Sequence, residues 1–146
     1  MPVLTCDILL ENVHRDLLFE ELGNIDMHQE VLKKACTSLE KINDNELKLS
    51  IKGRFKSRTV GYLLSQKDDD HGGRRIRIET TGKRSQGRLS YSLRTMKPSR
   101  NTLITITWDY DPGTGLGLLL DPLSLRETYT VFIKSVLSSL VSYFKK

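Results

Sequence analysis

The sequence predicts an α+β protein in which one long C-terminal helix covers one face of an antiparallel sheet. Residues 124–146 carry apolar side chains at the spacing of a single helical stripe. Upstream, much of the chain between residues 38 and 110 alternates apolar and polar side chains, which is typical of strands with one buried face. Because that face needs a cover and the helix offers the largest apolar surface, we expect the helix to lie along the sheet.

The composition is that of one water-soluble domain spanning residues 1–146. Hydrophobic residues make up 38% of the chain and charged residues 28%. No stretch approaches the ~18 apolar residues of a membrane span. The first residues lack a basic region followed by an apolar run, so we expect no secretory signal and a cytoplasmic protein. There, Cys6 and Cys36 are expected to be reduced thiols, and neither a metal nor a cofactor is indicated.

One strand and two short helices are predicted at the N-terminal end. Residues 3–10 alternate like a half-buried strand. Asn12 is a suitable N-cap for a helix over residues 13–22, which Gly23 would end. Asn24 opens a second short helix. The apolar side of this second helix is predicted to comprise Met27, Val31, Leu32 and Ala35.

Six further strands are predicted from alternating runs separated by short polar turns. Asp44 and Asn45 are a two-residue hairpin signal, and residues 68–73 and 83–87 predict two longer turns. The predicted strands are residues 38–43, 46–53, 58–66, 74–81, 88–97 and 101–110. With the first strand they make seven consecutive strands joined by short connections, as in an antiparallel meander.

Residues 111–122 combine glycine and proline with four leucines ahead of the final helix. A phosphate-binding loop is disfavoured, since no lysine follows the glycines and the predicted sheet is antiparallel. We interpret the segment either as a mobile, partly apolar lid at a cavity mouth or as a packed corner leading into the helix. The predicted apolar stripe of the helix is Tyr129, Phe132, Ile133, Val136, Leu137, Leu140, Val141 and Phe144.

This element order is similar to the helix-grip fold, and the sequence resembles the START-like superfamily, which includes Bet v 1 allergens and polyketide cyclases. The resemblance is carried by residues 13–22 with 25–28, by residues 88–110 and by residues 115–122. The Trp-Pro pair that is frequent in the family's second short helix is absent, and residues 27–30 (Met-His-Gln-Glu) replace it. The resemblance implies a curved seven-stranded sheet wrapped around the C-terminal helix. It also implies a cavity between them for a lipid, sterol, polyketide or aromatic compound.

The expected ligand contacts are inward-facing side chains of the strands, the loop and the helix. Tyrosine and tryptophan suit such a site because each joins an apolar ring to a hydrogen-bonding group. The expected set is Tyr62, Ile78, Tyr91, Ile106, Trp108, Leu116, Phe132, Val136 and Leu140. The alternative is a solid core, in which burial of each large side chain contributes roughly 1.5 to 3 kcal/mol to stability.

No catalytic group stands out in the sequence. His14, His28 and His71 fall at a helix start, in the second helix and in a turn, without a partner at triad or metal-ligand spacing. We therefore expect binding of a small hydrophobic ligand without catalysis. The alternative is a cyclase or dehydratase that uses the same cavity, which would need an acid and a base, or a histidine, lining the interior.

The chain has a net charge of +5, and many arginines alternate with the apolar side chains of the strands. This pattern leaves open a basic module that binds RNA, the ribosome or an anionic membrane. Glu79 and Asp109 interrupt the positive field, and no aromatic side chains are interleaved with the arginines. A solvated sheet face is therefore favoured over nucleic-acid binding, and any membrane contact is expected to be peripheral. Whether two copies pair through this face stays open.

Overall fold

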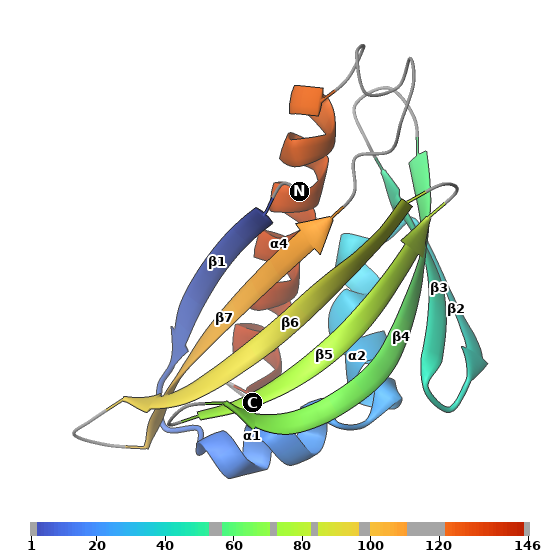
Figure 1. Cartoon of the computed structure of the whole chain (residues 1–146). Helices are drawn as coiled ribbons and strands as arrows, with labels where there is room; N and C mark the ends of the chain where they lie inside the picture. Colours follow the sequence, from blue (N-terminus) through green and yellow to red (C-terminus); the bar gives the residue numbers. More distant parts are fainter. Residues whose placement is uncertain are drawn as a thin grey trace.

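The computed structural model describes residues 3–52, 57–70, 73–82, 85–96, 100–110 and 122–144 and has the predicted α+β fold, shown in Figure 1. The strands are β1 (Val3–Leu10), β2 (Ser38–Asn43), β3 (Glu46–Lys52), β4 (Ser57–Asp70), β5 (Gly73–Gly82), β6 (Ser85–Met96) and β7 (Asn101–Tyr110). The helices are α1 (Arg15–Leu22), α2 (Ile25–Leu32), the 3₁₀ turn η1 (Lys33–Ala35) and α4 (Pro122–Phe144).

The strands form one seven-stranded antiparallel sheet in the order β1-β7-β6-β5-β4-β3-β2. The first strand pairs with the last, from Val3 opposite Asp109 to Leu10 opposite Thr102. The sheet curves around α4, while α1 and α2 close the same side (Figure 1). The predicted helix-grip architecture is therefore confirmed, with β1 and β2 as the two edge strands.

The alternation along each strand decides which side chains face the helices. In β5, Ile76, Ile78 and Thr80 are buried, whereas Arg75 and Arg77 are only half-buried on the opposite face. In β7 the same alternation buries Thr102, Ile104, Ile106, Trp108 and Tyr110. The inward and outward faces predicted for these two strands are confirmed.

Helix α4 buries most of its predicted apolar stripe against the sheet, α2 and η1. It begins at Pro122, a residue whose fixed backbone angle suits the first turn, two residues before the predicted start. The buried members of the stripe are Tyr129, Phe132, Ile133, Val136, Leu137 and Leu140. Val141 and Phe144, in the last turn, are only half-buried. The cover that α4 provides is therefore incomplete at its C-terminal end.

The predicted start of the first helix is wrong. Asn12 has a positive φ of 63°, and its backbone N–H donates to Asn101 Oδ1 at 3.0 Å, so it belongs to a turn tied to β7. The N-cap of α1 is His14, whose Nδ1 accepts a hydrogen bond from the Asp16 backbone N–H at 3.1 Å. Val13 is buried ahead of the helix rather than inside it.

The hairpin turns around β5 are shorter than predicted. The acidic run of residues 68–70 lies in β4, where Asp68 is opposite Arg75 and Asp69 is opposite Arg74 across the hairpin. Opposite charges in directly facing positions stabilise strand pairing, so the strand extends through residues that look like a turn in the sequence. Similarly, β6 starts at Ser85, within the predicted turn.

Candidate ligand-binding site

Eight of the nine expected ligand contacts lie together between the sheet and α4, where each side chain is 0% to 2% exposed. Leu116 lies outside the described residues, as does most of the segment predicted as a lid. The eight residues belong to one hydrophobic core cluster. Among the residues that the structure describes, this middle region is therefore closed by the protein's own side chains.

An aromatic cluster joins α4 to strand β7. The rings of Trp108 and Tyr129 stack at 4.1 Å with planes 22° apart, and Phe132 packs against Trp108 at 5.7 Å. The indole N–H of Trp108 donates to Thr80 Oγ1 at 3.2 Å. A pocket beside this cluster has a volume of about 10 Å³, which is room for no more than one water molecule.

One polar chain crosses the apolar interior beneath α2. His28 Nε2 lies 2.6 Å from the carbonyl oxygen of Leu22, and His28 Nδ1 lies 2.8 Å from Tyr62 Oη. Tyr62 Oη in turn lies 2.7 Å from Tyr91 Oη. The three side chains are 0% to 1% exposed. This His28 chain therefore links α2 with the end of α1 and with strands β4 and β6.

The direction of each hydrogen bond in the His28 chain follows from its two ends. A carbonyl oxygen only accepts, so His28 Nε2 must carry the proton. In a neutral imidazole Nδ1 is then the acceptor, and Tyr62 must donate to it. Tyr91 consequently donates to Tyr62. Every donor in the His28 chain of hydrogen bonds therefore has an acceptor, as a buried polar network requires.

The surroundings keep these groups uncharged. Burial lowers the pKa of His28 to about 4, and the hydrogen bond to Leu22 offsets only part of that effect. Burial also raises the pKa of Tyr62 and of Tyr91 well above the ordinary value. The neighbouring thiol of Cys36 has its pKa raised to about 11 by burial. At neutral pH the interior therefore carries polar groups but no charge at this point.

His28 was not among the expected site residues, although a signal for its burial exists in the sequence. It lies three residues after Ile25 and three and four residues before Val31 and Leu32, on the buried side of α2. Its partners come from β4 and β6 and lie 34 and 63 positions away along the chain. No local pattern indicates that pairing.

A groove with a volume of about 520 Å³ lies where the end of β1 faces the last turn of α4. Its walls are formed by Ile8, Leu9, Leu10, Glu11, Asn12, Val13, Val141 and Phe144. Most of these side chains are apolar, and Glu11 and Asn12 are exposed at the rim. The volume falls within the ~300 to 1,000 Å³ typical of small-molecule sites.

Two hydrogen bonds fix the β1 side of the groove. Asn12 is held by Asn101, as described above, and the hydroxyl of Thr102 donates to the Val13 carbonyl at 2.7 Å. Both partners come from the start of β7, next to the end of β1. The turn after β1 is therefore anchored to the sheet. The groove lies between this turn and the last turn of α4, whose Val141 and Phe144 are half-buried against the core.

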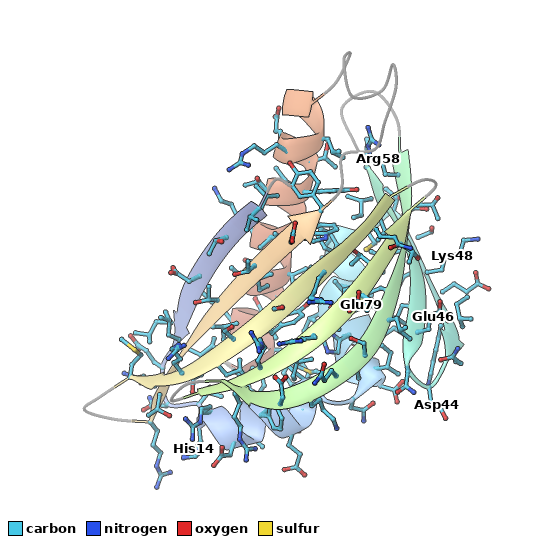
Figure 2. All side chains as sticks on the ribbon, viewed as in Figure 1. His14, Asp44, Glu46, Lys48, Arg58 and Glu79 are labelled. Atoms are coloured by element: carbon cyan, nitrogen blue, oxygen red, sulfur yellow. The ribbon has the colours of Figure 1, made fainter. Side chains whose placement is uncertain are left out.

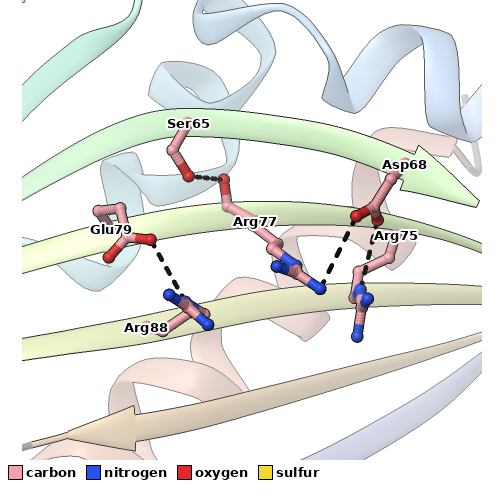
Figure 3. Close-up of polar contacts among 6 residues, drawn as sticks. All are labelled: Ser65, Asp68, Arg75, Arg77, Glu79 and Arg88. Carbon is pink, nitrogen blue, oxygen red and sulfur yellow. Dashed lines mark hydrogen bonds and ion pairs between the residues drawn. The ribbon is translucent and has the colours of Figure 1, made fainter. Parts of the chain in front are cut away.

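The outer face of the sheet carries several ion pairs between arginines and carboxylates of neighbouring strands. Asp68 accepts from Arg75 at 3.4 Å and lies 3.7 Å from Arg77, and Glu79 accepts from Arg88 at 3.3 Å (Figure 3). These two carboxylates pair with three of the arginines that suggested contact with nucleic acid. Arg54, Lys56 and Arg84, which belong to the same basic pattern, lie outside the described residues.

Metal ligands and membrane spans were sought in the same part of the chain. Among the described residues, no three His, Cys, Asp or Glu side chains are grouped so that they would hold a metal ion. No described helix is long and apolar enough to cross a membrane.

Sequence comparison alone identifies no relatives: no family model matches the chain, and no curated protein matches it. Solved structures, in contrast, match nearly its whole length. The Zhui aromatase/cyclase from Streptomyces sp. R1128 superposes with a TM-score of 0.71 and 12% identity, covering 97% of this chain and 92% of that chain.

Two further matches have the same fold. A START superfamily protein from Mycobacterium smegmatis has a TM-score of 0.63 and 8% identity, covering 97% of this chain and 95% of that chain. A norcoclaurine synthase from Thalictrum flavum, solved with a transition-state analogue, has a TM-score of 0.63 and 13% identity, covering 99% of this chain and 96% of that chain. The chain therefore has the START-like, Bet v 1-like fold that its element order predicts.

Proposed function

We propose that the protein binds a small hydrophobic molecule noncovalently between the sheet and α4, with the groove of β1 and α4 as its seat. The observation that supports this most directly is the groove itself, about 520 Å³ in volume, whose exposed lining combines the apolar side chains of Ile8, Val141 and Phe144 with a larger share of polar atoms. A guest placed there would cover Val141 and Phe144, the half-buried end of the helix stripe. Removing that apolar surface from water would favour binding.

The groove also favours a particular kind of guest. The half-buried side chains of Ile8, Val141 and Phe144 offer an apolar wall, while Glu11 is exposed at the rim. A molecule with an apolar body and one hydrogen-bond donor at its end satisfies both features, because the carboxylate accepts and the wall excludes water. A neutral lipid or a phenolic aromatic compound meets this description.

The predicted ligand contacts in the closed middle are proposed for a different state of the protein, in which the interior is open. Tyr62, Ile78 and Tyr91 are in van der Waals contact with the protein itself, so a guest reaches them only if the interior opens. We propose that they form the inner wall of the site in such an opened state. The groove requires no opening of the interior and is therefore the proposed binding site in the closed structure.

A second candidate function is a cyclase or dehydratase, and the buried His28 chain is the observation that favours it. A histidine in an apolar interior is the kind of acid–base group that such an enzyme needs. His28 is already hydrogen-bonded at both ring nitrogens and is 0% exposed. Binding without catalysis therefore fits the structure better. Turnover of an aromatic polyketide that is lost in His28→Gln while binding persists would support the enzyme.

Binding can be tested with N-phenyl-naphthylamine, a neutral dye that fluoresces in apolar sites and carries one N–H donor. The full chain should bind it in a saturable manner, and lipids or phenolic aromatics should displace it. In Val141→Trp, where an indole fills the groove, we expect the affinity for the dye to fall at least about tenfold, or about 1.4 kcal/mol.

Val131→Trp is the matched control for this experiment. Val131 lies on the same helix but is 62% exposed on its outer side, so the same substitution there should leave dye binding unchanged. Equal affinities in Val141→Trp and the unmodified chain would contradict the groove as the seat. No saturable binding to the unmodified chain of this dye or of any of the competitors would contradict the proposed function as a whole.

A further inference from the structure

The His28 chain fastens four segments of the fold at one buried point. The ring belongs to α2, the Leu22 carbonyl ends α1, and the two hydroxyls come from Tyr62 of β4 and Tyr91 of β6. The rings of Tyr62 and Tyr91 also pack against the imidazole, with centroids 5.5 and 5.3 Å away. The side of α2 that carries His28 therefore covers both tyrosines.

A second proton on His28 would be incompatible with this arrangement. Nδ1 would become a donor, so Tyr62 would have to accept from it and donate to Tyr91 instead. Tyr91 would then need a new acceptor for its own proton. The His28 chain would then contain one donor without an acceptor and a buried positive charge. Each of these raises the free energy of the folded state in an apolar interior.

No neighbouring charge compensates such a proton. Among the described residues, no carboxylate lies within ion-pair distance of His28, and the facing ionisable groups are the two phenols and the Cys36 thiol. The acidic side chains of α2 are exposed: Asp26 pairs with Lys41 of β2 at 3.0 Å, and Glu30 pairs with Lys33 at 3.4 Å. Further charged groups on packed elements are half-buried or exposed, among them Glu21 of α1, Glu46 and Lys48 of β3 and Lys34 of η1, and the buried phenol of Tyr129 in α4 packs against Trp108.

We propose that the His28 chain is an acid-sensitive latch: protonation of His28 releases α2 from the sheet and uncovers Tyr62 and Tyr91. The latch goes beyond the proposed function, because the groove of β1 and α4 needs no such opening. Release of α2 does not depend on a guest. Only its consequence, access of a guest to the inner wall, rests on the proposed function.

The pH range over which the latch opens follows from the difference between the pKa of His28 when α2 is docked and its pKa when α2 is released. The pKa of His28 is about 4 when docked and 6.5 when free, so the released state binds protons more readily. Docking is fully stable above pH 6.5 and weakens as the pH falls from 6.5 to 4. Between pH 7 and pH 4.5, proton linkage raises the equilibrium constant for release about 60-fold.

Amide hydrogen exchange on the guest-free full chain tests the latch. After correction for the intrinsic pH dependence of exchange, the opening constant of the α2 amides should rise about 60-fold from pH 7 to pH 4.5. The amides of Ile104 and Ile106 in β7 should remain more protected than those of α2. Unchanged α2 protection would overturn the latch, and so would identical opening constants in α2 and β7, which would indicate global unfolding alone.

Two variants separate His28 from other acid-sensitive groups. His28→Gln keeps a donor for the Leu22 carbonyl but does not titrate, so the rise in α2 opening should disappear. Asp26→Asn removes the exposed ion pair with Lys41 and should retain the rise. The same rise in His28→Gln would overturn the latch, as would its loss in Asp26→Asn.

If His28→Gln does not fold, the unmodified chain still decides the question. An NMR titration of the His28 ring should show a proton on Nε2 and a pKa near 4. A ring that titrates near the ordinary value, or one with its proton on Nδ1, would overturn the latch. His14 lies exposed at the start of α1 (Figure 2), and its ring gives a separate signal in the same spectra.

Discussion

The space between the sheet and α4 is closed at its middle and open at one end. In the middle, Phe132, Val136 and Leu140 of α4 are 0% to 2% exposed, and towards the β5–β6 hairpin Trp108 stacks on Tyr129 at 4.1 Å beside a pocket of only about 10 Å³. At the end, β1 and the last turn of α4 enclose about 520 Å³. The same apolar stripe of α4 borders both regions. Its first part is buried in the core, and its last turn, around Val141 and Phe144, is half-buried at the edge of the groove.

The contrast also separates two ways of placing polar groups. Inside, the His28 chain holds few groups, and each has a partner. Outside, charged side chains such as Arg88 and Glu79 pair across the sheet in contact with water. Burial makes each interior hydrogen bond difficult to lose, whereas solvent replaces the exterior ones. Equal numbers of interactions in the two regions therefore do not mean equal contributions to stability.

The largest expected effect is in the closed middle. Phe132→Ala removes a ring that is 2% exposed and packed against Trp108, so we expect the free energy of unfolding to fall by about 3 to 5 kcal/mol. Val141→Ala, at the half-buried end of the stripe, should cost less than half as much. Urea unfolding of both variants measures the difference. Equal losses would mean that the two regions are packed alike.

Loss of the central hydroxyl of the His28 chain should be the next largest effect. Tyr62→Phe leaves His28 Nδ1 without a donor and Tyr91 without an acceptor, so we expect a loss of about 2 to 3 kcal/mol in unfolding free energy. Tyr91→Phe removes only the terminal donor, and about 1 kcal/mol is expected. The order of the two variants in urea unfolding tests the assigned direction. A larger loss in Tyr91→Phe would contradict it.

Acid should destabilise the whole fold through the same histidine. Because the folded-state pKa of His28 is about 4, below its ordinary 6.5, the unfolded chain binds more protons between these values. The contribution of neutral His28 to the free energy of unfolding is fully present above pH 6.5 and is lost as the pH falls towards 4. The loss amounts to about 2 kcal/mol between pH 7 and pH 4.5. The difference between the pH profiles of the unmodified chain and His28→Gln isolates this contribution. Parallel profiles would contradict it.

The smallest effect is expected on the outer face. Glu79→Gln breaks the pair with Arg88, whose side chains are 39% and 55% exposed, so a loss of about 0.2 to 1 kcal/mol is expected. Salt screens such pairs, and the difference should shrink further in 1 M NaCl, roughly the concentration at which the screening length is ~3 Å. A loss comparable to that of Tyr62→Phe would remove the distinction between the two polar regions.

The sequence was sufficient to predict the sheet, the inward faces of its strands and the stripe of α4, because each depends on local periodicity. Tyr62 and Tyr91 were therefore placed inside correctly. The His28 chain was missed, since three residues far apart in sequence must meet at one point. The groove was missed for a similar reason: it depends on how the end of β1 and the last turn of α4 are placed in space, and no pattern within either segment predicts that placement.

Local turn chemistry misled in two places. Asn12 is a good N-cap by type, but Asn101 holds its backbone in a turn, and His14 caps α1 instead. The acidic run beginning at Asp68 looks like a turn, but the facing Arg75 extends the strand. In both cases a partner far along the chain outweighs the local preference.

The most direct test of a hydrophobic guest seated at the open end is paramagnetic mapping of its position. A neutral spin-labelled stearyl alcohol, which carries one hydroxyl donor, added to the ¹⁵N-labelled chain at pH 7 should broaden the amide signals of residues 8–13 and 141–144. The signals of Tyr62, Ile78 and Tyr91 should keep their intensity. Broadening centred on those three residues would place the guest in the middle instead, and uniform intensities throughout would contradict binding between the sheet and α4.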